Sequence, residues 1–128
     1  VEELDVLVCA LIEIVDNTIR AYTTEDLELA KKIESLEQVI DKLVDELKLR
    51  HIKRLRDGKC TIELGFIFSD LLTDIERVSD HCSNIAVAMI EVAMGSFDTH
   101  KYLNAVKNDS NADFSERFNE YAIKYNLV

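Results

Sequence analysis

Residues 64–92 read LGFIFSDLLTDIERVSDHCSNIAVAMIEV, the most regular apolar pattern in the chain. Their apolar side chains recur in alternating steps of four and three, which predicts a long helix with a single apolar stripe. The members of this stripe are Leu64, Phe68, Leu71, Ile75, Val78, Cys82, Ile85, Met89 and Val92. A stripe of this kind needs partner helices on one side, so the stretch predicts a helical bundle.

Two similar stripes precede this one. Residues 2–22 repeat apolar side chains at Leu4, Val8, Leu11, Val15, Ile19 and Tyr22, and the following "TTED" provides Thr23 or Thr24 as the N-cap of a second helix. The second stripe comprises Leu29, Ile33, Leu36, Ile40, Leu43 and Leu47, and continues less strictly through Ile52 and Leu55. "RDGK" at 56–59 ends this helix, with Gly58 suited to the left-handed conformation beyond a helix end.

The chain has no proline and three glycines among 128 residues, so it contains few residues that break helices. Long helices joined by short connections predict an all-α fold, an antiparallel three-helix bundle over residues 1–95. The tail, 96–128, is expected to add one or two short helices packed on the bundle. One would lie near 99–106, and Asp113 would cap the other, whose Phe114, Phe118, Tyr121 and Tyr125 would face the bundle.

The formal net charge of −10 restricts the classes of partner. It repels polyanions, so nucleic acid and bare anionic lipid are unfavourable partners, whereas cations and basic proteins are favoured. Three cysteines without a C-x-x-C pattern indicate free thiols in a reducing, cytosolic compartment. No apolar run approaches the roughly 20 residues that cross a bilayer, and a start at Val1 indicates a piece of a longer chain.

Acidic side chains stand four residues apart on two of the expected helices. Glu76 and Asp80 lie beside the stripe of 64–92, and Glu37 and Asp41 repeat the spacing on the preceding helix, with Glu34 one turn earlier. Because residues four apart share one face of a helix, each pair should project from its helix together. Glu76 and Asp80 are expected outside the core.

The two pairs should also lie level with each other. Glu37 and Asp80 are equally far from the turn at 56–59, as are Asp41 and Glu76, so antiparallel helices bring all four to about the same height, about 26 Å from the turn. Carboxylates at this separation repel one another unless a pKa rises, a base intervenes or a cation binds. Oxygen ligands from two helices can form a multinuclear metal site.

A solvated acidic face, with Arg77 and Lys42 as counterions, is the alternative interpretation of the same pattern. Other candidate ligands are weaker. His81 and Cys82 are adjacent, so they diverge by about 100° around a helix, and Cys82 fits a small core residue. His51 fits a helix-end cation or a packing residue. The sequence contains no phosphate loop, Ser-His-Asp set or His-rich metal motif, and no catalytic constellation is identified.

Two motifs resemble the repeated three-helix unit of the PhoU family. "DIERVSDHCSNIA" at 74–86 is similar to the E-x-x-x-D helix of that family, and "LEQVID" at 36–41 is similar to its preceding helix. "RHIKRLRDGKCTIELGFIFSDLL" at 50–72 resembles the second repeat of the C-terminal PhoU-like domain of bacterial sodium/phosphate cotransporter-related membrane proteins. The resemblance covers residues 1–94, and "FDTHKYL" at 97–103 is also of this type.

The resemblance implies a non-catalytic cytosolic regulatory domain, at the inner face of the cell membrane, that takes part in phosphate transport. It implies an iron or zinc cluster held by Glu76, Asp80, Glu37 and Asp41, and a transporter domain of the same chain or complex as partner. Ser79 replaces a glycine that is common in the motif, and one repeat is present where the family usually has two, so a homodimer is a further expectation.

Three hypotheses follow. The first is this metal-binding regulatory domain, whose acidic surface should not bind phosphate without metal. The second is a purely structural helical module for dimerisation or docking, in which the acids only confer solubility. A di-iron oxidase of the ferritin type is disfavoured, because the Glu-x-x-His pairs of such sites are absent from the sequence.

Overall fold

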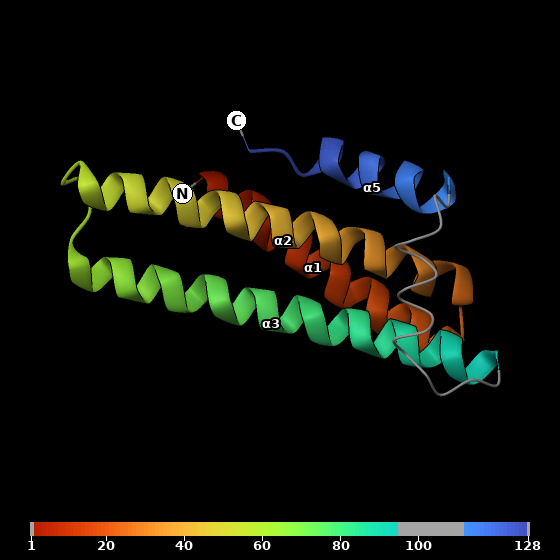
Figure 1. The fold of residues 1–128 in the computed structure, drawn as a ribbon. Coiled ribbons are helices and arrows are strands. Elements are labelled where there is room, and N and C mark those ends of the chain that lie inside the picture. Colours follow the sequence, from red (N-terminus) through yellow and green to blue (C-terminus); the bar gives the residue numbers. More distant parts are fainter. Residues whose placement is uncertain (1, 95–111, 128) are drawn as a thin grey trace.

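The computed structural model describes residues 2–94 and 112–127, and these ranges form four helices. The helices are α1 (Glu2–Thr24), α2 (Leu27–Arg56), α3 (Ile62–Ala93) and α5 (Ala112–Lys124). In Figure 1, each of α1, α2 and α3 runs antiparallel to the helix before it in the chain. α5 lies along α2, on the side away from α3. This arrangement confirms the all-α bundle with a short C-terminal helix. The short helix expected near 99–106 lies outside the described residues.

Local side chains fix the two connections. Asp26 is the N-cap of α2, because its carboxylate accepts a hydrogen bond of 3.1 Å from the backbone N–H of Leu29. The expected cap at Thr23 or Thr24 is therefore wrong: both hydroxyls donate to carbonyls of α1, at Ile19 and Arg20.

The α2–α3 connection agrees with the helix end predicted at 56–59. Gly58 has a φ of +73°, the left-handed conformation expected after a helix end. Thr61 then caps α3 by accepting a hydrogen bond of 3.2 Å from the backbone N–H of Leu64. Gly65 lets α3 approach α2 closely, since a Cβ there would lie 3.1 Å from Leu55 Cδ2 and 3.2 Å from His51 Nε2.

α2 is the central helix, since it contacts α1, α3 and α5. Its expected stripe from Ile33 to Leu47 is buried, in agreement with the sequence prediction. Ile52, in the looser continuation of that stripe, is instead 59% exposed. Each fully buried Leu or Ile contributes about 1.5–3 kcal/mol of burial free energy, so this helix supplies much of the stability of the core.

Part of the expected stripe of α3 is displaced from the buried surface, whereas Ile75 and Cys82 lie in the core and Phe68 and Met89 pack against it. Leu64, Leu71, Val78, Ile85 and Val92 are exposed, with exposed fractions of 40% or more. The buried line contains small residues, namely Gly65, Ser79, Cys82, Ser83 and Ala86, together with Leu72, Ile75 and Ile90. Small side chains allow the helices to approach closely. The larger apolar residues, one position away in the sequence, therefore lie at the edge of the helix contact and are exposed.

The same displacement occurs on α1. Leu7, Ala10, Ile14 and Ala21 are buried, whereas Ile19 and Tyr22 of the expected stripe are 57% and 67% exposed. Both α1 and α3 therefore retain exposed apolar side chains among the described residues. No helix within 2–94 or 112–127 is long and apolar enough to cross a membrane.

α5 is attached to the bundle by aromatic and charged contacts. Tyr125 is buried in the core, and Phe118 and Tyr121 are partly buried against it, as the sequence predicts. The helix begins at Ala112, so Asp113 lies inside it and not at the cap position. The carboxylate of Glu13, on α1, accepts hydrogen bonds from Lys124 Nζ and the Tyr125 hydroxyl. The side chain of Phe114 is outside the described part.

The pKa of Glu13 reflects this attachment. Burial raises the pKa, but the hydrogen bonds from Lys124 and Tyr125 outweigh it, and the net pKa is lowered from 4.5. A lowered carboxyl pKa stabilises the native protein above pH 4.5, and this stabilisation is lost as the pH falls through the native value.

We expect Glu13→Gln to lower the free energy of unfolding at neutral pH by about 1 kcal/mol, because it removes the charge that binds Lys124 and Tyr125. The loss is no larger because Lys124 is largely solvated. The difference from the native protein should disappear in acid. Urea unfolding at neutral and acidic pH, with hydrogen exchange of residues 115–125, measures both effects. Asp16→Asn is the control, since its ion pair with Arg20 is a surface contact of 3.6 Å. Equal losses in the two variants would contradict the prediction.

Candidate metal centre

The predicted ligands lie where α2 packs against α3, and they differ in burial. Glu37 is 5% exposed, Asp41 and Glu76 are half-buried, and Asp80 is exposed. Glu76 and Asp80 are therefore outside the core, as expected. Glu37 faces inward because α2, covered by three helices, has little solvated surface at this height.

Glu34 enters the interior beside them, with an exposed fraction of 4%. The hydroxyl of Ser83, on α3, donates a hydrogen bond to Glu34 Oε2. The Gln38 amide donates to Glu34 Oε1 at 3.1 Å and to Glu37 Oε2 at 3.2 Å. These donors compensate part of the cost of removing the two carboxyl groups from water.

The surroundings of Glu37 strongly perturb its acid–base equilibrium. Burial, followed by its hydrogen bond with Asp41 and repulsion from Glu34, Asp41 and Asp80, raises the pKa of Glu37 to about 9. The same hydrogen bond lowers the pKa of Asp41, so Glu37 is the donor and Asp41 the acceptor. At neutral pH Glu37 therefore retains its proton.

Asp41 connects this pair to α3. Burial, followed by repulsion from Glu76, Asp80 and Asp45, raises its pKa despite the hydrogen bond from Glu37. Glu37 in turn interacts with Asp80. The structure therefore brings together the four carboxyl groups that the level spacing on the two helices predicts.

The expected counterions have other roles in the structure. Lys48 Nζ lies 3.5 Å from Glu76 Oε2, a pair in which both side chains are about 40% exposed. Lys42 Nζ lies over the Phe118 ring, 4.6 Å from its centroid, so it attaches α5 to α2. Neither Lys42 nor Arg77 is seen to neutralise the four carboxyl groups.

We call Glu37, Asp41, Glu76 and Asp80 the carboxyl cluster. Its donor atoms are carboxyl oxygens, which fit a hard or borderline cation. Across the described ranges, however, no group of three or more His, Cys, Asp and Glu side chains is placed to hold a metal ion. Metal binding would require these side chains to turn toward one another and Glu37 to release its proton. The four residues have donor atoms suited to a metal ion, but their side chains are not arranged as a binding site in this structure.

The weaker candidates have structural roles or are solvated. His51 is buried and packs on Phe68, with ring centroids 4.7 Å apart, which confirms the packing role. Cys82 is a buried core residue, and His81 is exposed. Sequence reasoning noted Glu34 but not its interior position, because its hydroxyl partner, Ser83, comes from a distant part of the chain.

Comparison with known proteins gives a consistent result. The family profile described as the PhoU domain matches residues 10–89. A relative from Thermotoga maritima, the phosphate-specific transport system accessory protein PhoU homolog 1, is 26% identical over 109 residues. The alignment covers 85% of this chain and 47% of the relative, so the chain spans about half of the relative's length. No solved structure matches the chain significantly.

The raised pKa of Glu37 gives a pH dependence of stability. Between pH 4.5, the pKa of this carboxyl group in the unfolded chain, and about pH 9, the native protein retains a proton that the unfolded chain releases. The free energy of unfolding should therefore fall as the pH rises through this window. Glu37→Gln resembles the protonated carboxyl and should flatten this fall. Urea unfolding at about pH 5.5 and about pH 8.5 tests the prediction.

Glu46→Gln is the matched control, because Glu46 is an exposed acid on the same helix. A native protein whose stability is constant across the window, or a Glu46→Gln variant that flattens it equally, would contradict the assignment.

Proposed function

The chain belongs to the PhoU domain family, and on this premise we propose that it is a non-catalytic regulatory domain of a sodium-dependent phosphate transporter-related protein. The family assignment supports a role in phosphate transport, and PhoU homolog 1 is by its name an accessory protein of phosphate transport. The proposal extends this role to a domain connected with a transporter, in the cytoplasm at the inner face of the membrane.

A metal site is the second part of the proposal. The observation that supports it is the convergence of Glu37, Asp41, Glu76 and Asp80. Burial, together with repulsion among the acids, raises the pKa of the two on α2. Iron or zinc, when bound, would supply the positive charge that offsets this repulsion. Without metal, the carboxyl cluster repels phosphate, so we propose no direct phosphate binding by the metal-free domain.

The chain is further proposed to divide at residue 95, with 1–95 as the PhoU-like bundle and 96–128 as a helical tail. The contacts of Tyr125 and Lys124 with Glu13 support a tail that packs on the bundle. The partner would be a transporter domain of the same chain or complex.

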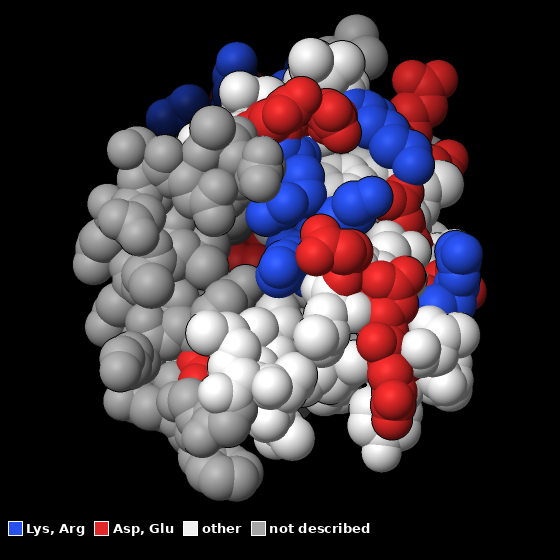
Figure 2. Space-filling model, turned by 90° about the vertical axis from the view of Figure 1, so that its right-hand side faces the viewer, with Lys and Arg blue, Asp and Glu red and all other residues white. Residues whose placement is uncertain are grey.

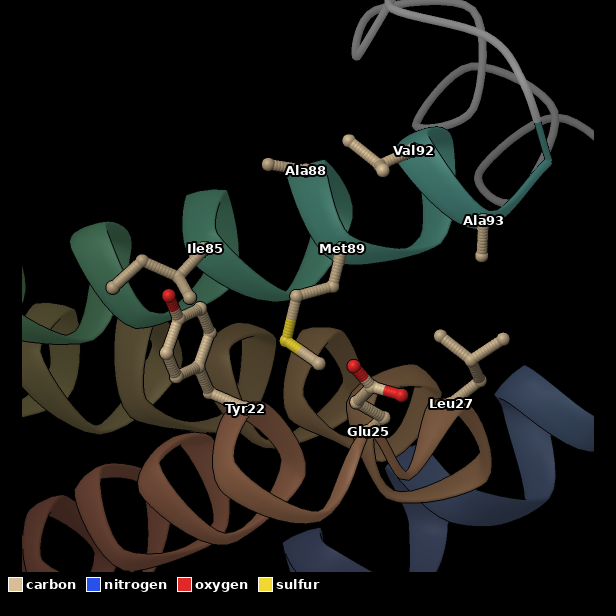
Figure 3. A pocket seen from close by; sticks show the side chains of 8 residues that line it. All are labelled: Tyr22, Glu25, Leu27, Ile85, Ala88, Met89, Val92 and Ala93. Carbon is tan, nitrogen blue, oxygen red and sulfur yellow. The ribbon is translucent and has the colours of Figure 1, made fainter.

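A helical docking module is the alternative function, and a specific surface favours it. Ile12, Ile19 and Tyr22 of α1 and Leu71, Val78, Ile85 and Val92 of α3 are exposed and form what we call the α1/α3 face. A groove of about 750 Å³ is lined by residues of this face, including Tyr22, Ile85 and Val92 (Figure 3). Figure 2 shows the adjoining end of the bundle, where an uncharged area lies below mixed acidic and basic side chains.

Several regularly spaced apolar side chains of this size are typical of a helix interface. In Figure 3 the Tyr22 ring stands beside Ile85, so the two helices form one continuous surface. A second copy of the chain is one occupant that such a surface would suit, as expected for a single repeat.

Elemental analysis of the untagged protein tests the metal proposal. Stoichiometric iron or zinc is expected in the native protein and should be lost in Glu76→Gln/Asp80→Asn, because two of the four oxygen ligands lose their charge. Asp70→Asn/Asp74→Asn, also exposed acids of α3, is the matched control. Metal-free native protein after incubation with iron or zinc, or strong phosphate binding to metal-free protein in a calorimetric titration, would refute the proposal.

Sedimentation at several protein concentrations tests the docking alternative. If the α1/α3 face joins two copies, Val78→Ser/Ile85→Ser should weaken the dimer about tenfold or more, since apolar area is lost on both subunits. Ile62→Ser/Phe66→Ser removes similarly exposed apolar side chains elsewhere on α3 and should have no effect. A monomer at all concentrations, or equal weakening by both variants, would exclude this interface.

A further inference from the structure

Basic side chains are concentrated at one end of this acidic protein. Residues 48–59 contain six of the 15 basic residues and one of the 25 acidic residues, a formal charge of +5 in a chain of −10. This segment covers the last turns of α2 and the turn that leads to α3, at the left end of the bundle in Figure 1. The rest of the chain is correspondingly more acidic.

Half of these basic residues are committed to ion pairs. Arg50 and Arg54 both bind Glu3, with Arg50 Nη1 2.7 Å from Glu3 Oε1, and Lys48 pairs with Glu76. The other half, Lys53, Arg56 and Lys59, are exposed and have no ion-pair partner among residues 2–94 and 112–127.

Large apolar side chains are exposed beside these cations. Leu49 and Ile52 of α2 are 65% and 59% exposed, and the helical step places both within an arc of about 100° that also includes Lys53 and Arg56. Ile62 and Phe66, on the first turns of α3, are 72% and 69% exposed.

A hollow of about 290 Å³, lined in part by Ile52, Ile62 and Phe66, joins the two helices into one surface. We call this surface the hairpin-end face: Leu49, Ile52, Lys53, Arg56, Lys59, Ile62 and Phe66. The acidic residues nearest to it in sequence are Asp57 in the turn, Glu63 on α3, and Asp45 and Glu46, about one turn before Leu49.

We propose that the hairpin-end face binds an anionic lipid surface, with its apolar side chains in the interface and its cations against the headgroups. Basic residues next to exposed Leu, Ile and Phe are the composition of interfacial membrane-binding elements. The inference goes beyond the proposed function and does not depend on it. The face lies at the tip of the hairpin, where a flat surface can approach it.

The net charge of −10 does not prevent this contact. At physiological salt, electrostatic interactions decay over about 8 Å. Glu76, the member of the carboxyl cluster nearest to the face, is paired with Lys48. Asp41 precedes Lys53, the first cation of the face, by 12 residues, which corresponds to about 18 Å along α2. The membrane would therefore experience the hairpin end and little of the carboxyl cluster.

The chemistry of the face favours lipid over other polyanions. Nucleic acid would engage the cations but would leave Ile62 and Phe66 without apolar contacts, and it extends far enough to meet the acidic remainder of the protein. An acidic protein segment would also engage the cations, and the experiment below distinguishes it from lipid.

Flotation with vesicles tests the proposal. The native protein should bind vesicles of phosphatidylcholine with about 30% phosphatidylglycerol, bind pure phosphatidylcholine at least tenfold more weakly, and dissociate as salt rises. Lys53→Gln/Arg56→Gln/Lys59→Gln should weaken binding about a hundredfold, since each cation near an anionic surface contributes about fivefold. Ile62→Ser/Phe66→Ser should weaken it about tenfold at constant charge.

Two matched controls accompany these variants. Arg20→Gln/Lys32→Gln/Arg77→Gln removes the same charge from exposed positions outside the hairpin end, and Ile12→Ser/Ile19→Ser removes similar apolar area from the α1/α3 face. Both should bind like the native protein. All substituted residues are exposed, and circular dichroism verifies that each variant is folded.

Three outcomes would overturn the proposal: no binding to anionic vesicles, equal weakening by the control and test variants, or binding of polyglutamate or heparin without binding of vesicles. The last outcome would assign the face to a polyanionic macromolecule. None of them would bear on metal content or on the role in phosphate transport.

Discussion

α2 packs against three helices, α1, α3 and α5, and this packing removes most of the circumference of α2 from water. This helix is nevertheless rich in acids, so some of its carboxyl groups must enter the interior. Glu34 and Glu37 do so, with exposed fractions of 4% and 5%. An isolated carboxylate cannot remain charged in such surroundings without compensation, and the chemistry of the carboxyl cluster follows from that requirement.

The protein compensates its buried acids in different ways. Glu34 accepts hydrogen bonds from Ser83 and Gln38, whereas Glu37 retains a proton and donates to Asp41. Glu3, by contrast, binds Arg54 and Arg50, and these contacts lower its pKa despite partial burial. Among the described residues, Glu76 is the one member of the cluster with a basic partner, Lys48, so a cation is a chemically suitable addition for the others.

The surface divides into regions of different chemistry. The carboxyl cluster lies along the α2–α3 side, the α1/α3 face is apolar, and the hairpin-end face combines cations with apolar side chains. Each region is positioned by the rigid helices and their lengths. A single three-helix unit therefore presents three surfaces of different chemistry.

The sequence by itself determined the number and approximate extent of the long helices, because apolar periodicity, Gly58 and the absence of proline act locally. It also predicted that Glu37, Asp41, Glu76 and Asp80 converge, since equal distances from one turn fix equal heights on antiparallel helices. Only the tertiary structure decided which side of α1 and α3 is buried. The apolar surface of each helix is wider than one contact, and the small residues Gly65, Ser79 and Ala86 select the close approach that leaves Val78 and Ile85 exposed. The interior position of Glu34 likewise depends on a hydroxyl 49 residues away in the chain, a long-range contact that no local pattern specifies.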